Sequence, residues 1–253
     1  MNIAVIRDGH SDYCVIRQFV SAIFEHHHSV KLKYDDFFEE DVLNISDPIN
    51  RYIDKSDKKN ADYTLYGKHA DELKNEVFIV LHTAFNKLSK EKGIFFSNQN
   101  VLIVNTDAEK ILNKKDSYFE KWAYTLNAVL WLAIEEFYNK MTEMGYAYES
   151  LPLILPLILF PSSEILVAAC MYDFAKEKEN FRSLKAKPDL KQKVYETDSI
   201  PRAFRTGKLL EVLSAFVVPD SLQDIYKQIP EVRKFMQILS FSTACAISSE
   251  IMQ

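Results

Sequence analysis

Glycine is scarce in this chain, with five residues among 253. The Gly-rich phosphate loops GxxxxGKS/T and GxGxxG are both missing, which argues against a P-loop NTPase and against a Rossmann-type dinucleotide enzyme. Cysteine is scarcer still: Cys14, Cys170 and Cys245 are far apart, are odd in number and form no CxxC pair. This usage argues against a disulfide framework and a zinc site, and it predicts reduced thiols in the cytoplasm.

Long apolar runs are missing as well. The most apolar stretch, LPLILPLILF at residues 151–160, is too short to cross a bilayer and contains two prolines. The opening MNIAVIRDGH has no long apolar stretch after a basic region, so no signal peptide is expected. The formal net charge is -5, so the protein as a whole does not attract polyanions. We therefore expect a cytoplasmic protein that does not associate with membranes.

Short apolar runs alternate with helical patterns along the chain. Apolar residues make up 47% of the sequence, enough for a sizeable core. Runs typical of strands occupy residues 2–7, 29–34, 100–105 and 151–160, and helical spacing covers about 12–26, 69–90, 163–177 and a long stretch that begins after a capping box at Ser117 and Glu120. Strands separated by helices predict an α/β fold with a mostly parallel sheet flanked by helices.

The domain organisation follows from changes in composition. We expect an α/β domain over residues 1–178, with a polar insertion or loop at 44–68. Residues 179–253 are expected to form a basic loop and a helical C-terminal part packed on that domain, with helices near 207–216, 220–228 and 230–240.

Acidic side chains follow three of the predicted strands. In open parallel sheets, ligands bind outside the carboxyl ends of the strands. The residues at these ends include Asp8, with Asp12 just beyond, after the first strand, Asn105, Asp107 and Glu109 after the third, and Glu164 after the fourth. Oxygen ligands of this kind suit Mg²⁺ or Mn²⁺, with a phosphodiester substrate completing the shell. The alternative is that they are ordinary capping and turn residues.

A basic segment lies in the C-terminal part. Residues 180–208 contain eight positive and three negative charges, a local excess of five on an acidic protein. The candidate phosphate-binding residues are Arg182, Lys185, Lys187, Arg202 and Arg205. The segment is a candidate surface for DNA or RNA, and the alternative is a solvated loop.

Three short segments carry a resemblance to a known family. IAVIRDGHSDYCVIRQFV resembles the opening of a Toprim domain, where a strand ends in an acidic residue and glycine and a helix follows. VLIVNTDAEK resembles the second Toprim motif, a strand ending in Asp-x-Asp. LFPSSEILVAA resembles a Pro-x-x-Glu segment of RloB-like proteins. These are compact bacterial Toprim relatives, often encoded beside ABC-type ATPases in phage-defence loci.

The resemblance implies roles for individual residues. Asp8 falls at the position of the Toprim glutamate that acts as general acid or base. Asp107 matches the second Asp of the metal-binding pair, and Asn105 replaces the first. Because Asn105 carries no charge, Glu109 or Glu164 is expected to compensate as a metal ligand. The resemblance thus implies catalysis by Asp8 and Asp107 with Mg²⁺ or Mn²⁺.

Two functions from different classes follow from these observations. The first is a metal-dependent nuclease of an antiviral defence system that acts with an ABC-type ATPase partner. The second is a catalytically inactive Toprim-fold subunit that binds a partner protein or nucleic acid, which the shorter Asp8 and the uncharged Asn105 favour. Self-association into a homo-oligomer is compatible with both.

Overall fold

The computed structural model describes residues 1–6, 10–40, 45, 68–91, 93, 97–107, 119–159, 162–171, 222–223, 225–226, 229 and 232–239. The chain divides into two units that alternate along the sequence, with boundaries after residues 8, 35, 106, 113 and 158. The first, third and fifth segments form one unit, which contains almost all of the sheet. The second, fourth and sixth segments form the other.

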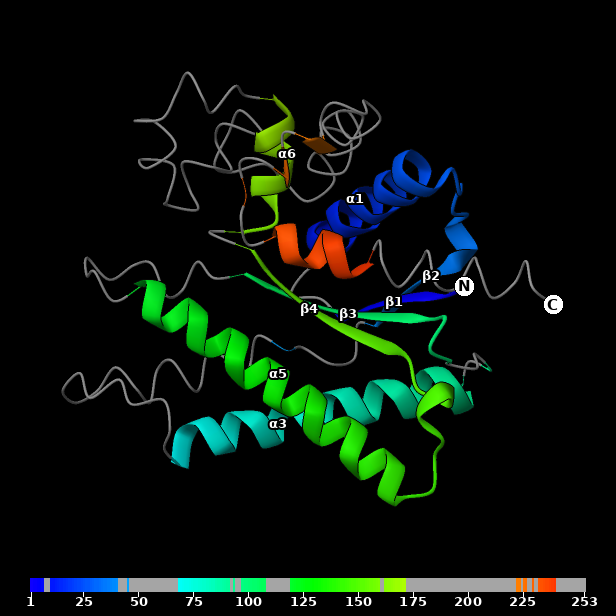
Figure 1. Ribbon diagram of the computed structural model, residues 1–253, viewed down its shortest axis with the longest axis vertical. Coiled ribbons are helices and arrows are strands. Elements are labelled where there is room, and N and C mark those ends of the chain that lie inside the picture. Colours follow the sequence, from blue (N-terminus) through cyan, green and yellow to red (C-terminus); the bar gives the residue numbers. More distant parts are fainter. Residues whose placement is uncertain are drawn as a thin grey trace. The chain divides into compact units, whose positions relative to one another are not determined.

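The sheet has four strands in the order β2-β1-β3-β4 (Figure 1). β1 (Ile3–Ile6) pairs in parallel with β2 (Phe37–Glu40) on one side and with β3 (Val101–Asp107) on the other. β4 (Leu153–Leu159) lies beyond β3. This parallel sheet, connected through helices, confirms the predicted α/β class.

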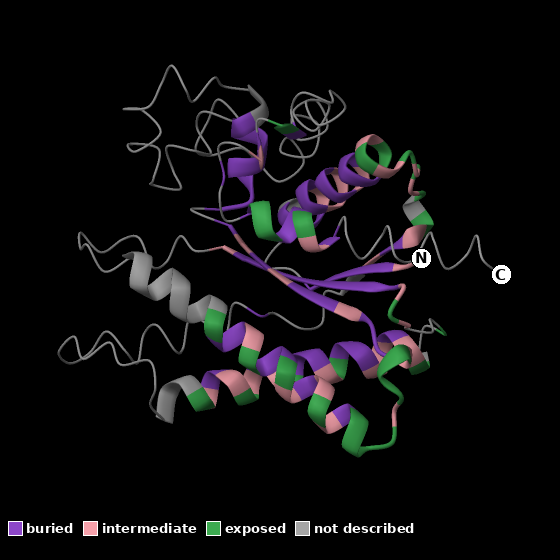
Figure 2. Ribbon diagram, viewed as in Figure 1, coloured by how far each residue is buried: buried purple, intermediate pink, exposed green. Residues whose placement is uncertain are grey.

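The central strands are buried along their length, as Figure 2 shows. All four residues of β1 and the first six of β3 are buried, so both faces of these strands are covered. Strands of this kind consist of nearly continuous apolar residues, as IAVI and VLIV do. At the end of the strand order, β4 carries the half-buried Pro156, a residue that sheets accept mainly in edge strands.

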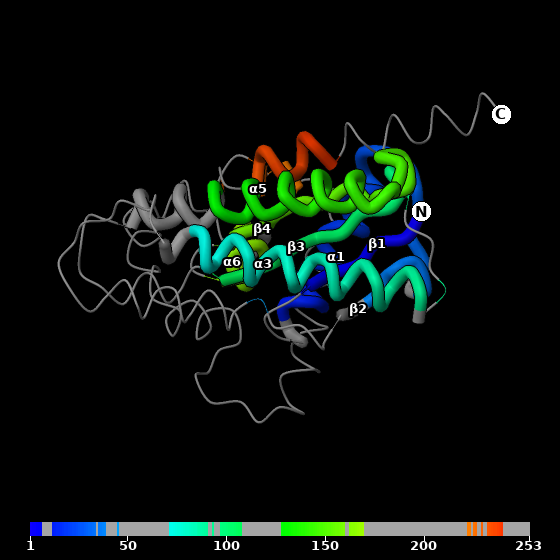
Figure 3. Tube along the Cα trace, turned by 90° about the horizontal axis from the view of Figure 1, so that it is seen from below, coloured from blue at the N-terminus to red at the C-terminus, as the bar shows by residue number. Residues whose placement is uncertain are grey.

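Two long helices pack on each other within the same unit as the sheet. α3 (Lys68–Asn86) continues as a short π-helix at Lys87–Glu91 and lies beside α5 (Phe119–Glu143), as Figures 1 and 3 show. Phe85 and Phe137 meet edge to face with ring centroids 5.8 Å apart. On the solvent side, Glu136 lies 2.8 Å from Lys140 and 3.5 Å from Lys74, and these two lysines hold its carboxyl pKa below the usual value.

The described residues of the other unit are mostly helical. α1 (His10–His28) packs against α6 (Glu164–Met171). Residues 232–239 form a further helical stretch, and the rings of Phe19 and Phe235 stack with centroids 6.3 Å apart. α1 ends where Ser29 adopts a left-handed conformation with φ of 56°.

The second predicted strand is wrong in position. Residues 29–33 are not in a strand, residues 34–36 form a single 3₁₀ turn, and β2 begins at Phe37. The alternation of SVKLKY misled the prediction because Val30 and Leu32 are only half-buried at the end of α1. The buried Phe37 lies opposite Ile3 in the sheet. The other three strands and the helices that fall in the described ranges were predicted correctly, with small shifts at their ends.

Parts of the predicted organisation lie outside the described residues. These parts are the polar segment 44–68, apart from Ile45 and Lys68, the boundary near residue 178, and the helix at 207–216. The expected domain division therefore stays a prediction. In the part of the chain that the structure describes, no helix has both the length and the apolar character that crossing a bilayer requires.

Tyr138 generates a prediction about stability. Its hydroxyl donates to the carbonyl of Pro152 at 2.7 Å and accepts from the amide of Ile154 at 3.0 Å, so it ties α5 to the start of β4. Tyr138→Phe leaves both buried backbone groups unpaired, and we expect a loss of about 1–3 kcal/mol in the free energy of unfolding by urea. Tyr148→Phe, at a ring that is 59% exposed, is the control. Equal losses in both variants would contradict this account.

His28 generates a prediction about pH. Burial lowers the pKa of His28 below 6.5, and the neighbouring His27 lowers it further. The folded state therefore takes up the proton less readily than the unfolded state. Neutral His28 therefore contributes to the free energy of unfolding. This contribution is fully present above about pH 6.5 and is lost as the pH falls toward the folded-state pKa. We expect urea unfolding midpoints at about pH 7.5 and about pH 5.5 to differ less in His28→Gln than in the wild type. An unchanged difference would rule out this contribution.

Candidate metal centre

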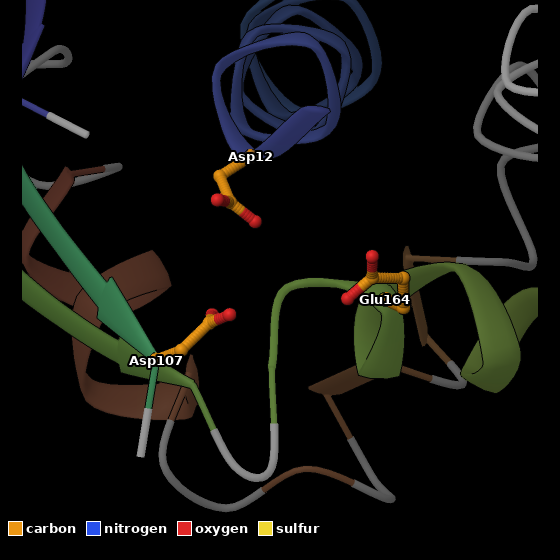
Figure 4. A group of neighbouring side chains, drawn as sticks. All are labelled: Asp12, Asp107 and Glu164. Atoms are coloured by element: carbon orange, nitrogen blue, oxygen red, sulfur yellow. The ribbon is translucent and has the colours of Figure 1, made fainter. Parts of the chain in front are cut away.

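Three carboxylates from three elements meet in one place (Figure 4). Asp12 lies in the first turn of α1, Asp107 is the last residue of β3, and Glu164 is the first residue of α6. All three belong to the same structural unit, and each offers an oxygen within 4.8 Å of the other two. Figure 4 shows their carboxylates pointing toward one another. We call this set the acidic triad.

Two members of the acidic triad are almost completely buried. Asp12 is 6% exposed and Glu164 is 1% exposed, while Asp107 is half-buried. Asp12 is buried because it lies one helical turn before Ile16, on the face of α1 that carries the apolar side chains. Asp and Glu are seldom buried to this extent without a compensating partner, so the burial itself marks the site.

Two serines before α6 donate hydrogen bonds to all three carboxylates. Ser162 Oγ donates to Glu164 Oε2 at 2.5 Å. Ser163 donates its backbone N–H to Asp107 Oδ1 at 3.0 Å and its hydroxyl to Asp12 Oδ1. Both serines are fully buried. Each serine therefore contacts a carboxylate directly.

The acidic triad places three carboxyl groups close together. The chosen oxygens lie within 4.8 Å of one another, and two unit negative charges at that limit would repel by about 3 kcal/mol at an effective dielectric constant of about 20. Hydrogen bonds to charged acceptors offset part of this cost. A divalent cation between the oxygens would replace the repulsion by attraction.

The donor set fits a hard divalent cation. Mg²⁺ and Mn²⁺ prefer carboxylate oxygens. Oxygens bound to one octahedral Mg²⁺ are about 3.0 Å or about 4.2 Å apart, because each bond is about 2.1 Å long. The limit of 4.8 Å lies slightly above this range, a difference that small side-chain rotations or a bridging water can close. The ligands would be Asp12, Asp107 and Glu164.

The structure brings together two of the predicted ligands and adds one. Asp107 and Glu164 were predicted as metal ligands and both belong to the acidic triad. Asp12 was noted after the first strand but was not assigned to the site. Its signal in the sequence is a carboxylate in register with Ile16 and Phe19 on the apolar stripe of a helix, where such a charge is unexpected.

Asn105 lies two residues before Asp107 on β3, and alternation along a strand turns both side chains to the same side of it. Its Nδ2 donates to the carbonyl of Leu157 at 3.2 Å, and this contact fixes the orientation of the amide. Its Oδ1 is buried and has no hydrogen-bond partner among the described residues. The expected role of Asn105 as a metal ligand stays a prediction.

The remaining predicted site residues lie outside the described parts of the chain. They are Asp8, Glu109 and the basic residues Arg182, Lys185, Lys187, Arg202 and Arg205. Their roles in catalysis, metal binding and nucleic-acid binding stay predictions.

Comparisons with known proteins yield no relative for this chain. Neither the protein-family models, nor the curated proteins, nor the solved structures contain a match to it. The resemblance to Toprim domains therefore rests on the three short segments quoted above. The candidate metal centre rests on the geometry of Asp12, Asp107 and Glu164.

Proposed function

We propose that this protein is a Mg²⁺- or Mn²⁺-dependent enzyme that cleaves phosphodiester bonds in nucleic acid. The observation that carries the proposal is the acidic triad: three carboxylates from three separate elements, each offering an oxygen within 4.8 Å of the others. Capping alone does not account for it, because the side chains of Asp12 and Glu164 are buried and converge with Asp107.

The topology of the sheet supports this proposal. In the order β2-β1-β3-β4, the chain places β2 on one side of β1 and β3 on the other, so the strand order reverses between β1 and β3. Open α/β sheets bind ligands at the carboxyl ends of the strands at such a reversal. Asp107 ends β3, and Asp12 lies in the helix that follows β1.

The side chains take distinct roles in the proposed reaction. Asp12, Asp107 and Glu164 would hold the cation, which would supply charge stabilisation for the attacking or leaving oxygen of the phosphodiester. Ser162 and Ser163 orient these carboxylates. Following the Toprim resemblance, Asp8 would act as general acid or base, and Glu109 would compensate as a metal ligand for the uncharged Asn105.

The wider setting of the proposal comes from the same resemblance. The fold is then a Toprim-like sheet, and an ABC-type ATPase is the expected protein partner in an antiviral defence system, as for RloB-like proteins. The basic segment, with Arg182, Lys185, Lys187, Arg202 and Arg205, is the proposed contact for the phosphates of DNA or RNA.

Metal binding is the first prediction of the proposed function. Calorimetric titration of Mn²⁺ into the wild type is expected to show binding, and Asp107→Asn and Glu164→Gln are each expected to weaken it at least about 10-fold, because each loses a charged ligand. Asp71→Asn, at an exposed acid of α3, is the matched control and should leave the affinity unchanged. A wild type that shows no affinity for Mn²⁺ would refute the metal centre.

Metal-dependent cleavage is the second prediction. With Mn²⁺ or Mg²⁺, labelled single-stranded DNA, duplex DNA or RNA is expected to be cut by the protein together with its ATPase partner. EDTA should abolish the reaction, and Asp12→Asn should slow it by about 100-fold, because the cation loses one of its ligands. Cleavage that persists in EDTA, or at full rate in Asp12→Asn, would show that a different site cuts the substrate.

A second candidate function is a catalytically inactive Toprim-fold subunit that binds a partner protein or nucleic acid. Asn105 favours it, because this residue carries no charge where a metal-binding acid is expected, and its amide nitrogen bonds to the carbonyl of Leu157. Filter binding of labelled DNA and RNA separates the two functions. Retention of nucleic acid without cleavage under any metal condition would select the binding subunit.

A further inference from the structure

Ser163 donates to two members of the acidic triad at once. Its hydroxyl donates to Asp12 Oδ1, and its backbone N–H donates to Asp107 Oδ1 at 3.0 Å. These partners come from the first turn of α1 and from the last residue of β3, which are far apart in the sequence. Ser163 itself is fully buried, and its bond to Asp12 is buried as well, so bulk water does not compete for that bond.

The two hydrogen bonds counter a specific physical problem. Carboxylates that repel one another turn apart unless something holds them, and a turned carboxylate does not face a shared cation. A donor that binds one oxygen of a carboxylate also fixes the direction in which the second oxygen points. Hydrogen bonds to ionised acceptors are roughly twice as strong as bonds between neutral groups, which suits them to this task.

We propose that Ser163 is a positioning residue that holds Asp12 and Asp107 in the orientation in which both face one divalent cation. This inference rests on the proposed metal function and adds to it the residue that prearranges the ligands. Ser163 acts through the two carboxylates and does not itself touch the substrate. Outer residues of this kind typically contribute about 10–100-fold to metal affinity.

The two bonds depend differently on the side chain. The bond from the amide to Asp107 survives every substitution except proline, whereas the bond from the hydroxyl to Asp12 needs serine or threonine. Ser163→Ala therefore removes only the bond to Asp12, and Ser163→Thr keeps it. Ser150→Ala is the matched control, because among the described residues the Ser150 hydroxyl bonds to the nearby Ala147 carbonyl and to no part of the acidic triad.

The test is a calorimetric titration of Mn²⁺ into the wild type, Ser163→Ala, Ser163→Thr and Ser150→Ala, with folding checked by circular dichroism. We expect Ser163→Ala to bind Mn²⁺ about 10–100-fold more weakly. We expect Ser163→Thr to recover the wild-type affinity and Ser150→Ala to keep it. If Ser163→Ala does not fold, Ser163→Cys, which has a weaker donor on a side chain of similar size, replaces it with the same expectation.

The outcomes separate this inference from the proposed function. If the wild type binds Mn²⁺ and Ser163→Ala binds it equally well, the role of Ser163 is overturned and the metal centre stands. If Ser163→Thr loses as much affinity as Ser163→Ala, the hydroxyl is not what matters, and the inference is again overturned. If the wild type does not bind Mn²⁺, the proposed function fails first and this inference fails with it.

Discussion

The parallel pairing of β1 with both of its neighbours is the constraint on which the other features depend. Ile3 lies opposite Phe37 on one side and Val101 on the other. Parallel strands cannot be joined by a tight hairpin, so the chain leaves each strand at its carboxyl end and returns through a longer connection. Helices α1, α3 and α5 lie in these connections. Because the central strands are buried throughout, polar groups accumulate where strands end and helices begin.

Helix starts reduce the cost of burying charge in the acidic triad. Asp12 lies in the first turn of α1, and Glu164 is the first residue of α6. The amino end of a helix carries a partial positive charge, which stabilises a nearby carboxylate by a few tenths to about 1 kcal/mol. With the hydrogen bonds from Ser162 and Ser163, this contribution offsets part of the repulsion among the acids. A divalent cation would neutralise the repulsion that is left.

The sequence predicted best the strands that consist of continuous apolar residues. The strands at IAVI and VLIV could be predicted because they are unbroken apolar runs bounded by polar residues. β2 could not, because FFEE is short and half polar, and it is a strand only because it pairs with β1. A short strand of this composition owes its structure to its neighbour, which local patterns do not reveal.

The site was predictable to the extent that a rule about strand ends applies. That rule identified Asp107 and Glu164. Asp12 lies inside helix α1, so predicting it would have required recognising that it lies on the apolar face of that helix. The hydrogen bonds of Ser163 could not be predicted from the sequence, because they join Ser163 to Asp12 and Asp107, which are far from it along the chain. No local spacing encodes a contact between residues so far apart.

The outer edge of β4 has a consequence for assembly. The amide of Leu153 donates to the carbonyl of Asn100, so alternate residues of β4 turn their N–H groups toward β3, and Ile154, Pro156 and Ile158 face away from it. The Ile154 amide is taken by the Tyr138 hydroxyl, and proline has no N–H to offer. An incoming strand would find two of these three positions without a donor. This edge of β4 therefore resists strand addition and the aggregation that follows from it.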